Sequence, residues 1–338
     1  MTAPLSDAEQ VMLRDAVRTY LAKDDAPRWF DFIDRLGIGR ALLDAQQGAI
    51  IAEEIGRARV HLPLAEVATA AWLLDRCNAP VPPATAIATL AWAEPGLRYD
   101  FAGIETRARR NGDGWRLEGT KAVVDWATEA DALLVAARTG GDGLSLFRID
   151  SARTDGLRLS PYRTIDGHPA ADLIFEDHAL PDDALIGPEC GALDLLEEAR
   201  DRALALLAAE AVGLLDSLLE QTIAYTGQRR QFGQPIAGFQ ALQHRMVDMY
   251  LECELARSSA WLAVEALDER PAARARAVSS AMVNIARACR LVGQEAIQLH
   301  GGMGMTDELP IGHYVKRAMA IEVSWADSDW HLARIAGL

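Results

Sequence analysis

The chain has 338 residues, of which 50% are hydrophobic and 25% are charged. This length and balance are typical of a globular protein with two or three structural units and a large core. Its 34 basic residues are outnumbered by 49 acidic ones, which gives a net charge of −15 without any lysine- or arginine-rich run. The sequence therefore disfavours duplex nucleic acid as a partner.

The sequence also argues against membrane insertion and metal binding. No apolar run reaches the roughly 18 to 20 residues that span a bilayer, and the first residues lack the basic and apolar regions of a signal peptide. We therefore expect a cytoplasmic protein. The cysteines are scattered, with no CxxC pair and no histidine at metal-ligand spacing, which predicts reduced core thiols and no metal site at Cys77, Cys190, Cys253 and Cys289.

Helical spacing dominates the first part of the chain, from residue 5 to about residue 80. Ser6 followed by Glu9 is a capping box that predicts a helix start. The stretches "GAIIAEEIGRA" and "PLAEVATAAWLLDRC" repeat the amphipathic pattern, and the three prolines of "CNAPVPPATA" mark a boundary. We expect an N-terminal helical domain over 1–85.

Short alternating or β-branched runs separated by turns replace this pattern from about residue 86. The stretch "ARRNGDGWRLEG" predicts a hairpin with its turn at NGDG. We expect an all-β middle domain, a barrel or sandwich, over 86–187.

Long helices return after residue 187, at roughly 191–229, 239–267, 271–299 and 311–336, which predicts a C-terminal four-helix bundle over 188–338. Between the last two helices, "QLHGGMGMTDELP" contains Gly301, Gly302 and Gly304. Each glycine costs about 1 kcal/mol in a helix interior, so this segment needs bare backbone. A tight helix crossing, a plain turn or a phosphate-binding loop would each meet that need.

Four stretches carry a resemblance that covers essentially the whole chain. They are "AEEIGRA" (52–58), "LEGTKAVV…ADALLVAAR" (117–138), "YTGQRRQFGQPIAGFQALQHRMVDM" (225–249) and "QEAIQLHGGMGM" (294–305). Together with the helical, β, helical order, they resemble the acyl-CoA dehydrogenase family. The resemblance implies an α+β fold of that type, an FAD cofactor, an acyl-CoA substrate and an electron-transfer flavoprotein as electron acceptor.

The resemblance also implies where FAD would bind. Arg229, Phe232, Gln298, Gly301 and Gly302 match positions that hold the pyrophosphate and adenosine of FAD, in contacts that reach into the neighbouring subunit's cofactor site. Bare glycine backbone suits such a loop, because its N–H groups can approach a pyrophosphate closely. For Phe232, a simple core position is the alternative.

The family's catalytic base is missing from both places where relatives carry it. Counting along the family pattern from Gln298 reaches Trp325, and counting back from Phe232 reaches Ala203. Neither side chain can remove the α-proton of a thioester substrate. Carboxylates stand near these positions, and each is most simply a solvated side chain: Glu198, Asp201, Glu322 and Asp327.

The segments that face the flavin in relatives are altered too. "WAEPGLRYDFAG" keeps Glu94 and Pro95 but lacks the family's threonine and glycine-serine pair, and "VVDWATEA" stands where WITNG-like residues are usual. The chain is also shorter than self-sufficient members. It resembles the non-catalytic partner in actinobacterial steroid-degradation enzymes, which pair two such chains as α2β2 heterotetramers. Two alternatives remain: a self-sufficient flavoenzyme with Asp201 or Glu198 as a relocated base, and a cofactor-free scaffold.

Overall fold

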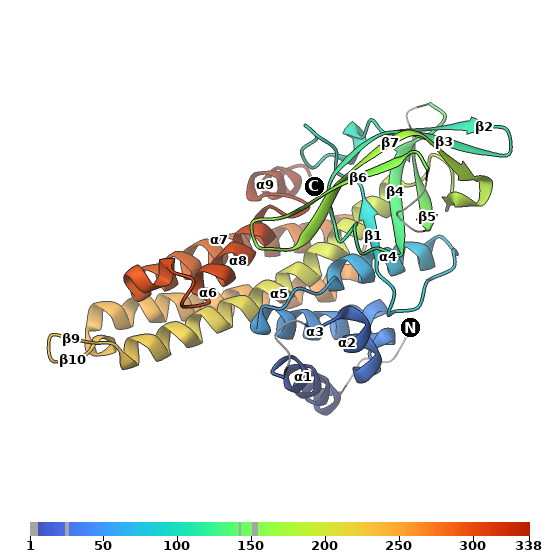
Figure 1. Ribbon diagram of the computed structural model, residues 1–338. Coiled ribbons are helices and arrows are strands. Elements are labelled where there is room, and N and C mark those ends of the chain that lie inside the picture. The colour runs from blue at the N-terminus through green and yellow to red at the C-terminus, as the bar shows by residue number, and fades with distance from the viewer. Residues whose placement is uncertain (1–5, 24–26, 142, 151–154) are drawn as a thin grey trace. The chain divides into compact units, whose positions relative to one another are not determined.

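The computed structural model describes residues 6–23, 27–141, 143–150 and 155–338 (Figure 1). The chain divides into two compact units, which we describe separately. Unit 1 comprises Met1–Ala26, Ala45–Val60 and Leu204–Leu338, and unit 2 comprises Pro27–Asp44 and His61–Ala203. The expected N-terminal helical region starts at residue 5, which lies outside the described residues.

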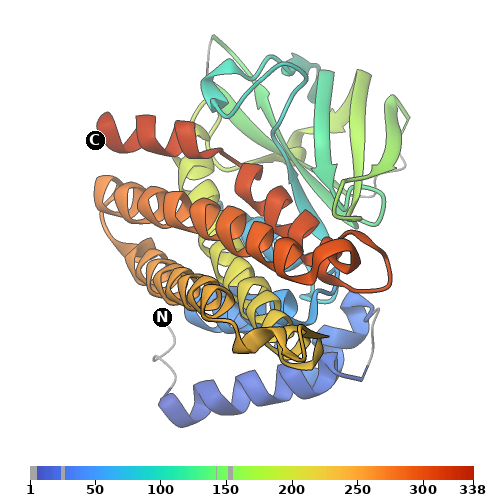
Figure 2. The ribbon, with the colours of Figure 1, turned by 90° about the vertical axis from the view of Figure 1, so that its left-hand side faces the viewer.

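Unit 1 is helical. In Figure 2, α6 and α7 run side by side, and α7 also packs against α8 and α9, while α1 packs against α3. The helix α5 (Leu193–Gln228) enters this unit at Leu204. The other helices are α1 (Asp7–Leu21), α3 (Ala45–Ala58), α6 (Gln240–Glu265), α7 (Pro271–His300), α8 (Ile311–Val323) and α9 (Ser328–Ala336).

Local capping signals explain where two of these helices begin. The capping box predicted at the start of α1 is confirmed, because the Ser6 side chain accepts from the Glu9 N–H and the Glu9 carboxylate accepts from the Ser6 N–H at 2.8 Å. The expected single helix over 311–336 is wrong. It is two helices, because α8 ends at Val323 and Asp327 caps a new helix by accepting from the Trp330 N–H at 2.9 Å.

Two glycines bring α3 and α5 into backbone contact. A Cβ on Gly56 would stand 1.9 Å from the Glu210 carbonyl oxygen, and a Cβ on Gly213 would stand 1.8 Å from the Glu53 carbonyl oxygen. Only glycine permits this approach, because any side chain would overlap the facing backbone.

A chain of ion pairs surrounds this helix crossing. Glu53 pairs with Arg14 at 2.8 Å and with Arg257 at 2.9 Å. Asp216 pairs with Arg257 at 2.7 Å and with Arg57 at 2.8 Å. Both carboxylates are largely buried, so each needs these cationic partners to offset the loss of water.

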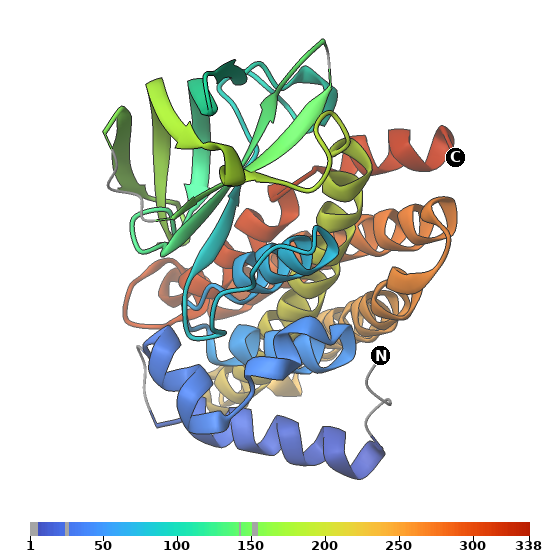
Figure 3. The same ribbon diagram turned by 90° about the vertical axis from the view of Figure 1, so that its right-hand side faces the viewer.

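Unit 2 contains an eight-stranded mixed sheet, ordered β6-β7-β3-β2-β4-β5-β8, with β1 paired in parallel to β4. Figure 3 shows the strands curving together. The strands are β1 (Ala88–Ala91), β2 (Arg107–Asn111), β3 (Gly114–Asp125), β4 (Ala132–Arg138), β5 (Leu144–Asp150), β6 (Leu157–Arg163), β7 (Pro169–Pro181) and β8 (Leu185–Ile186).

The expected hairpin is confirmed. Its antiparallel strands β2 and β3 pair Asn111 with Gly114 around the turn. Gly112 has φ +59, a left-handed conformation that suits this turn position. In the apolar core of this unit, the Trp115 and Phe147 rings meet edge to face at a centroid distance of 5.1 Å.

Shorter helices complete unit 2. They are α2 (Trp29–Leu36), α4 (Leu64–Arg76) and the 3-10 turns η1 (Gly39–Leu43), η2 (Phe101–Gly103) and η3 (Asp182–Ala184). Helix α4 ends at Arg76 and strand β1 begins at Ala88, so the proline-rich segment separates helices from strands as expected. The α+β class, with helical segments flanking a β region, is confirmed. The three domain boundaries stay a prediction, since the two compact units cut across them.

The cysteine prediction is only partly correct. All four cysteines are free, and Cys253 and Cys289 are buried, where burial raises the pKa of each thiol to about 12. Cys190, however, is exposed and Cys77 is half-buried, so describing them as core thiols was wrong. Among the described residues, no helix is long and apolar enough to cross a membrane, and no group of His, Cys, Asp and Glu could hold a metal ion.

Candidate functional site

The glycine segment forms a short 3-10 turn, η6 (Gly301–Met305), directly after α7 in unit 1. Gly301 has φ +60 and ψ −139, a conformation that a residue with a side chain rarely adopts. Its N–H donates to the Gln298 carbonyl at the C-terminal end of α7. Gly304 has a different reason to be glycine, because a Cβ there would stand 2.9 Å from the Ile297 carbonyl oxygen.

Space remains open around the first two glycines. Apart from the adjoining residues of the chain, no heavy atom of the described residues lies within 4 Å of a Cβ placed on Gly301 or Gly302, and both residues are exposed. A tight helix crossing at these two positions is therefore excluded. Gly302 has neither a positive φ nor a close neighbour to require glycine, so its exposed backbone is free to face a ligand.

The second segment of the site follows the end of α5. After Gln228 the chain makes a small hairpin of β9 (Arg230–Gln231) and β10 (Gln234–Pro235), followed by the turn η4 (Ile236–Gly238) and by α6. Figure 1 shows this hairpin at the end of α5. Arg229 is exposed, and its guanidinium forms no ion pair with another described residue.

Phe232 occupies the tip of the hairpin. Its side chain is 90% exposed and its φ is +51, an unusual conformation for a bulky residue. The alternative of Phe232 as a simple core residue is therefore wrong. Its ring meets Phe239 edge to face at 6.0 Å but leaves most of its surface uncovered.

One aromatic contact brings the two segments together. The Tyr225 ring, one turn before Arg229, stacks on the His300 ring at a centroid distance of 4.4 Å. Gln298 is exposed one half-turn earlier on α7. The ends of α5 and α7 are thus in contact through these rings, and the predicted half-site residues follow or lie beside them: Arg229 after α5, and Gln298 with the exposed glycines at the end of α7.

These groups fit the pyrophosphate side of FAD. A diphosphate needs positive charge and N–H donors that it can approach closely. Arg229 provides the charge, and the open backbone at Gly301 and Gly302 provides the approach. The residue assignments themselves stay a prediction.

Neither expected base position holds a carboxylate. Ala203 is fully buried in α5. Trp325 is half-buried between α8 and α9, with φ +63. A methyl group and an indole cannot take up a proton from a substrate carbon.

All of the neighbouring carboxylates have interaction partners. Glu322 accepts from Arg290 Nε at 2.6 Å, and Asp327 caps α9. Glu198 accepts from Arg202 at 3.2 Å within α5. Asp201 is completely buried in the same helix and is not without a partner, so the expectation of a solvated side chain is wrong for this residue. An ion-paired or capping carboxylate is a weaker candidate for a base than a free one.

In unit 2, the segment "WAEPGLRYDFAG" is held by a buried ion pair that sequence analysis missed. Lys121 Nζ lies 2.6 Å from Glu94 Oε1 and donates to the Trp92 carbonyl at 3.2 Å. Glu94 also accepts the Glu105 and Thr106 N–H groups. Glu94 therefore joins three segments of the sheet domain.

The pKa values of this pair reflect opposing effects. Burial lowers the pKa of Lys121 to about 8, although Glu94 acts to raise it. Burial also acts to raise the pKa of Glu94, but Lys121 and the hydrogen-bond donors hold it below its usual range. The pair is thus ionised at neutral pH, buried and mutually dependent.

Two family models match the chain. The acyl-CoA dehydrogenase C-terminal domain matches residues 197–336, and the acyl-CoA dehydrogenase middle domain matches residues 89–178. The probable acyl-CoA dehydrogenase YngJ of Bacillus subtilis is 32% identical over 265 residues, which cover 74% of this chain and 67% of that protein. The match spans only 62% of the length of the bovine mitochondrial short-chain specific acyl-CoA dehydrogenase.

Solved structures agree with these matches. A variant of the Tcur3481-Tcur3483 steroid ACAD has a TM-score of 0.86 and 27% identity, with 98% of this chain and 97% of that chain covered. The ChsE4-ChsE5 complex from Mycobacterium tuberculosis has a TM-score of 0.86 and 22% identity, with 100% and 98% covered. The chain belongs to the acyl-CoA dehydrogenase family, whose members are FAD-dependent flavoproteins.

Proposed function

We propose that this chain is the non-catalytic subunit of an FAD-dependent acyl-CoA dehydrogenase, an oxidoreductase acting on a CH–CH bond. It would offer the pyrophosphate and adenosine half of an FAD site to a partner chain that carries the base. The observation that carries this proposal is the contrast between the exposed half-site at the ends of α5 and α7 and the absence of a carboxylate at Trp325 and Ala203.

Each half-site residue would have a distinct task. Arg229 would place its guanidinium against the pyrophosphate, and Gly301 and Gly302 would let backbone N–H groups approach the same group. Phe232 and Gln298 would contact the adenosine side. The bound FAD would supply the hydride acceptor, which no protein side chain provides.

An exposed apolar stripe on α6 supports association with another chain. One face of this helix carries large apolar side chains that are between 41% and 62% exposed: Val247, Tyr250, Leu251, Leu255 and Leu262. The opposite face buries Met249, Cys253 and Ala256. An apolar surface of this kind on a water-exposed helix commonly marks a protein interface.

The partner and substrate classes follow from the resemblance and from two solved relatives. One of these is described as a steroid ACAD and the other as a complex of two chains. By analogy we propose an α2β2 assembly with a second acyl-CoA dehydrogenase-like chain, a steroid side-chain thioester as the acyl-CoA, and an electron-transfer flavoprotein as acceptor. A cytoplasmic location also stays a prediction.

Co-expression with the partner chain tests the proposal. We expect a heterotetramer with two FAD, one for each pair of unlike chains, and a colourless product when this chain is expressed alone. Absorbance between about 350 and 500 nm, the flavin region, measures the stoichiometry. Four FAD per tetramer would contradict the half-site role.

Two other outcomes would identify the alternatives. If the chain purified alone is yellow and reduces a dye with an acyl-CoA, it is a self-sufficient enzyme with a relocated base. If no assembly binds FAD, the chain is a scaffold. Flavin content and turnover are measured on the same samples. Each combination of the two results therefore agrees with only one of the three functions: non-catalytic subunit, self-sufficient enzyme or scaffold.

A further inference from the structure

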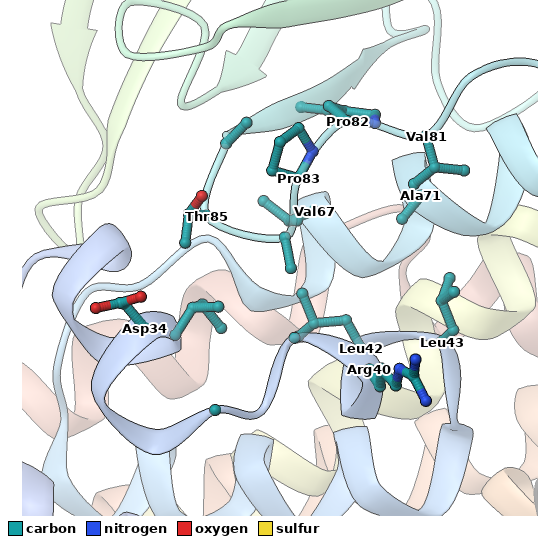
Figure 4. Close-up of a pocket in the computed structure, with 16 residues that line it drawn as sticks. Asp34, Arg40, Leu42, Leu43, Val67, Ala71, Val81, Pro82, Pro83 and Thr85 are labelled. Carbon is teal, nitrogen blue, oxygen red and sulfur yellow. The ribbon is translucent and has the colours of Figure 1, made fainter.

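Unit 2 contains an apolar cavity that shares no residue with the proposed half-site. Its volume is about 520 Å³, within the range of roughly 300 to 1,000 Å³ that is usual for small-molecule sites. The walls come from α2 and η1, from α4, and from the proline-rich segment before β1 (Figure 4).

Two contacts fix the proline-rich wall. The Trp29 indole N–H donates to the Ala84 carbonyl at 3.0 Å. Gly39 lies so close to this segment that a Cβ there would stand 2.9 Å from the Ala84 Cβ. Pro82 and Pro83 further restrict the backbone. The cavity is therefore held open by packed and hydrogen-bonded walls rather than by a loose loop.

The lining is apolar in the middle and polar at its two ends. Leu42, Val67 and Pro83 lie in the middle of Figure 4. Figure 4 shows Asp34 and Thr85 at one end and Arg40 at the other. Neither Asp34 nor Arg40 forms an ion pair with another described residue, so both ends keep unused polar groups.

We infer that this cavity binds a small aliphatic carboxylate with a hydroxyl at its far end. Arg40 suits the carboxylate, because a guanidinium can make two parallel hydrogen bonds to it. The Asp34 carboxylate can accept a hydrogen bond from the ligand hydroxyl, and the Thr85 hydroxyl can add a second hydrogen bond. The methylene chain between them lies against the apolar middle, which favours its removal from water. The inference is independent of the proposed flavin role.

Calorimetric titration of the full-length chain tests the inference with 10-hydroxydecanoate, decanoate and 1-decanol as probes. We expect 10-hydroxydecanoate to bind most tightly and decanol at least tenfold more weakly. Arg40→Gln should weaken 10-hydroxydecanoate at least tenfold and leave decanol unchanged, because only the acid uses the guanidinium. Arg35→Gln is the matched control, since Arg35 is exposed on α2 but does not line the cavity.

Filling the cavity provides a second test. Val67→Phe should abolish binding of all three probes, and Leu43→Trp at the half-exposed rim serves the same purpose if Val67→Phe does not fold. The inference is overturned if no probe binds at about 1 mM, the weak end of measurable affinity. It is also overturned if Arg40→Gln binds 10-hydroxydecanoate as wild type does, or if the assembled partner chain blocks all binding by occupying the cavity.

Discussion

Tyr225 and His300 stack with their ring planes 28° apart, and this contact joins the end of α5 to the end of α7. His300 is buried, and its Nδ1 lies 2.7 Å from the Ala296 carbonyl oxygen. One aromatic pair therefore joins the helix that leads to Arg229 to the helix that leads to Gly301.

The first prediction concerns pH. Burial lowers the pKa of His300 below its ordinary value of 6.5, although the hydrogen bond with Ala296 opposes this. As pH falls, the unfolded chain therefore binds a proton at His300 at a higher pH than the folded chain does. The free energy of unfolding consequently decreases as pH falls below about 6.5. We expect His300→Asn to lose less thermal stability than wild type between about pH 7 and pH 5. Thermal unfolding of both proteins at about pH 7 and about pH 5 provides the measurement, and an equal loss of stability in the two proteins would contradict the prediction.

Removal of the charge at Arg229 should weaken FAD binding. A guanidinium on a pyrophosphate makes charge-assisted hydrogen bonds worth about 1.5 to 3 kcal/mol, so Arg229→Ala should lower the affinity of the assembled complex for FAD roughly ten- to hundredfold. Flavin titration and circular dichroism together measure affinity and folding. Arg276→Ala is a matched control, because Arg276 is exposed near the opposite end of α7. Equal FAD affinity in the two variants would count against the half-site.

Replacement of the indole at the usual base position should have little effect on chemistry. We expect Trp325→Phe to leave turnover of the assembled complex within a few-fold of wild type, because an indole transfers no proton. Steady-state kinetics with normal assembly and FAD content as controls provide the measurement. Abolished turnover under those conditions would contradict the non-catalytic role.

The same assay distinguishes a relocated base. Glu198→Gln and Asp201→Asn keep the size of each side chain and remove its basicity, so neither should reduce turnover of the complex if the partner carries the base. A large loss of turnover in one variant, with FAD content intact, would assign the base to this chain instead.

The buried pair of Glu94 and Lys121 should be costly to break. Lys121→Met leaves Glu94 without its cation in a buried site, so we expect a loss of about 3 to 5 kcal/mol in the free energy of unfolding. Urea denaturation measures this loss. The double variant with Glu94→Gln should recover part of it, since no unpaired charge then remains. A single variant as stable as wild type would show that the pair contributes little.

Local signals were enough to predict much of the fold. The capping box at Ser6 and the hairpin turn around Gly112 depend on residues within a few positions, and both are confirmed. The break between α8 and α9 had a local signal as well, because Asp327 is a favourable N-cap followed by a helical pattern. Because apolar residues continue at helical spacing on both sides of Asp327, the sequence pattern predicted a single helix there.

Features that depend on distant residues could not be predicted. Nothing near Glu94 indicates that Lys121 is its partner, and nothing near Cys190 indicates that its side chain stays exposed. The family pattern predicted the residues of the half-site, but the stacking of Tyr225 on His300 required coordinates, since the two rings come from helices 75 positions apart.

The ion pairs around the α3 and α5 crossing can form only in a certain order while the chain is being synthesised. Glu54 pairs with Arg14 and Arg18, which leave the ribosome before it. Glu53 also needs Arg257, which lies 204 positions later in the chain. A nascent chain that ends before residue 257 of 338 therefore carries Glu53 and Asp216 with only part of their neutralising charge. The first helices to be synthesised can associate early, but they reach their final electrostatic state only when α6 has emerged.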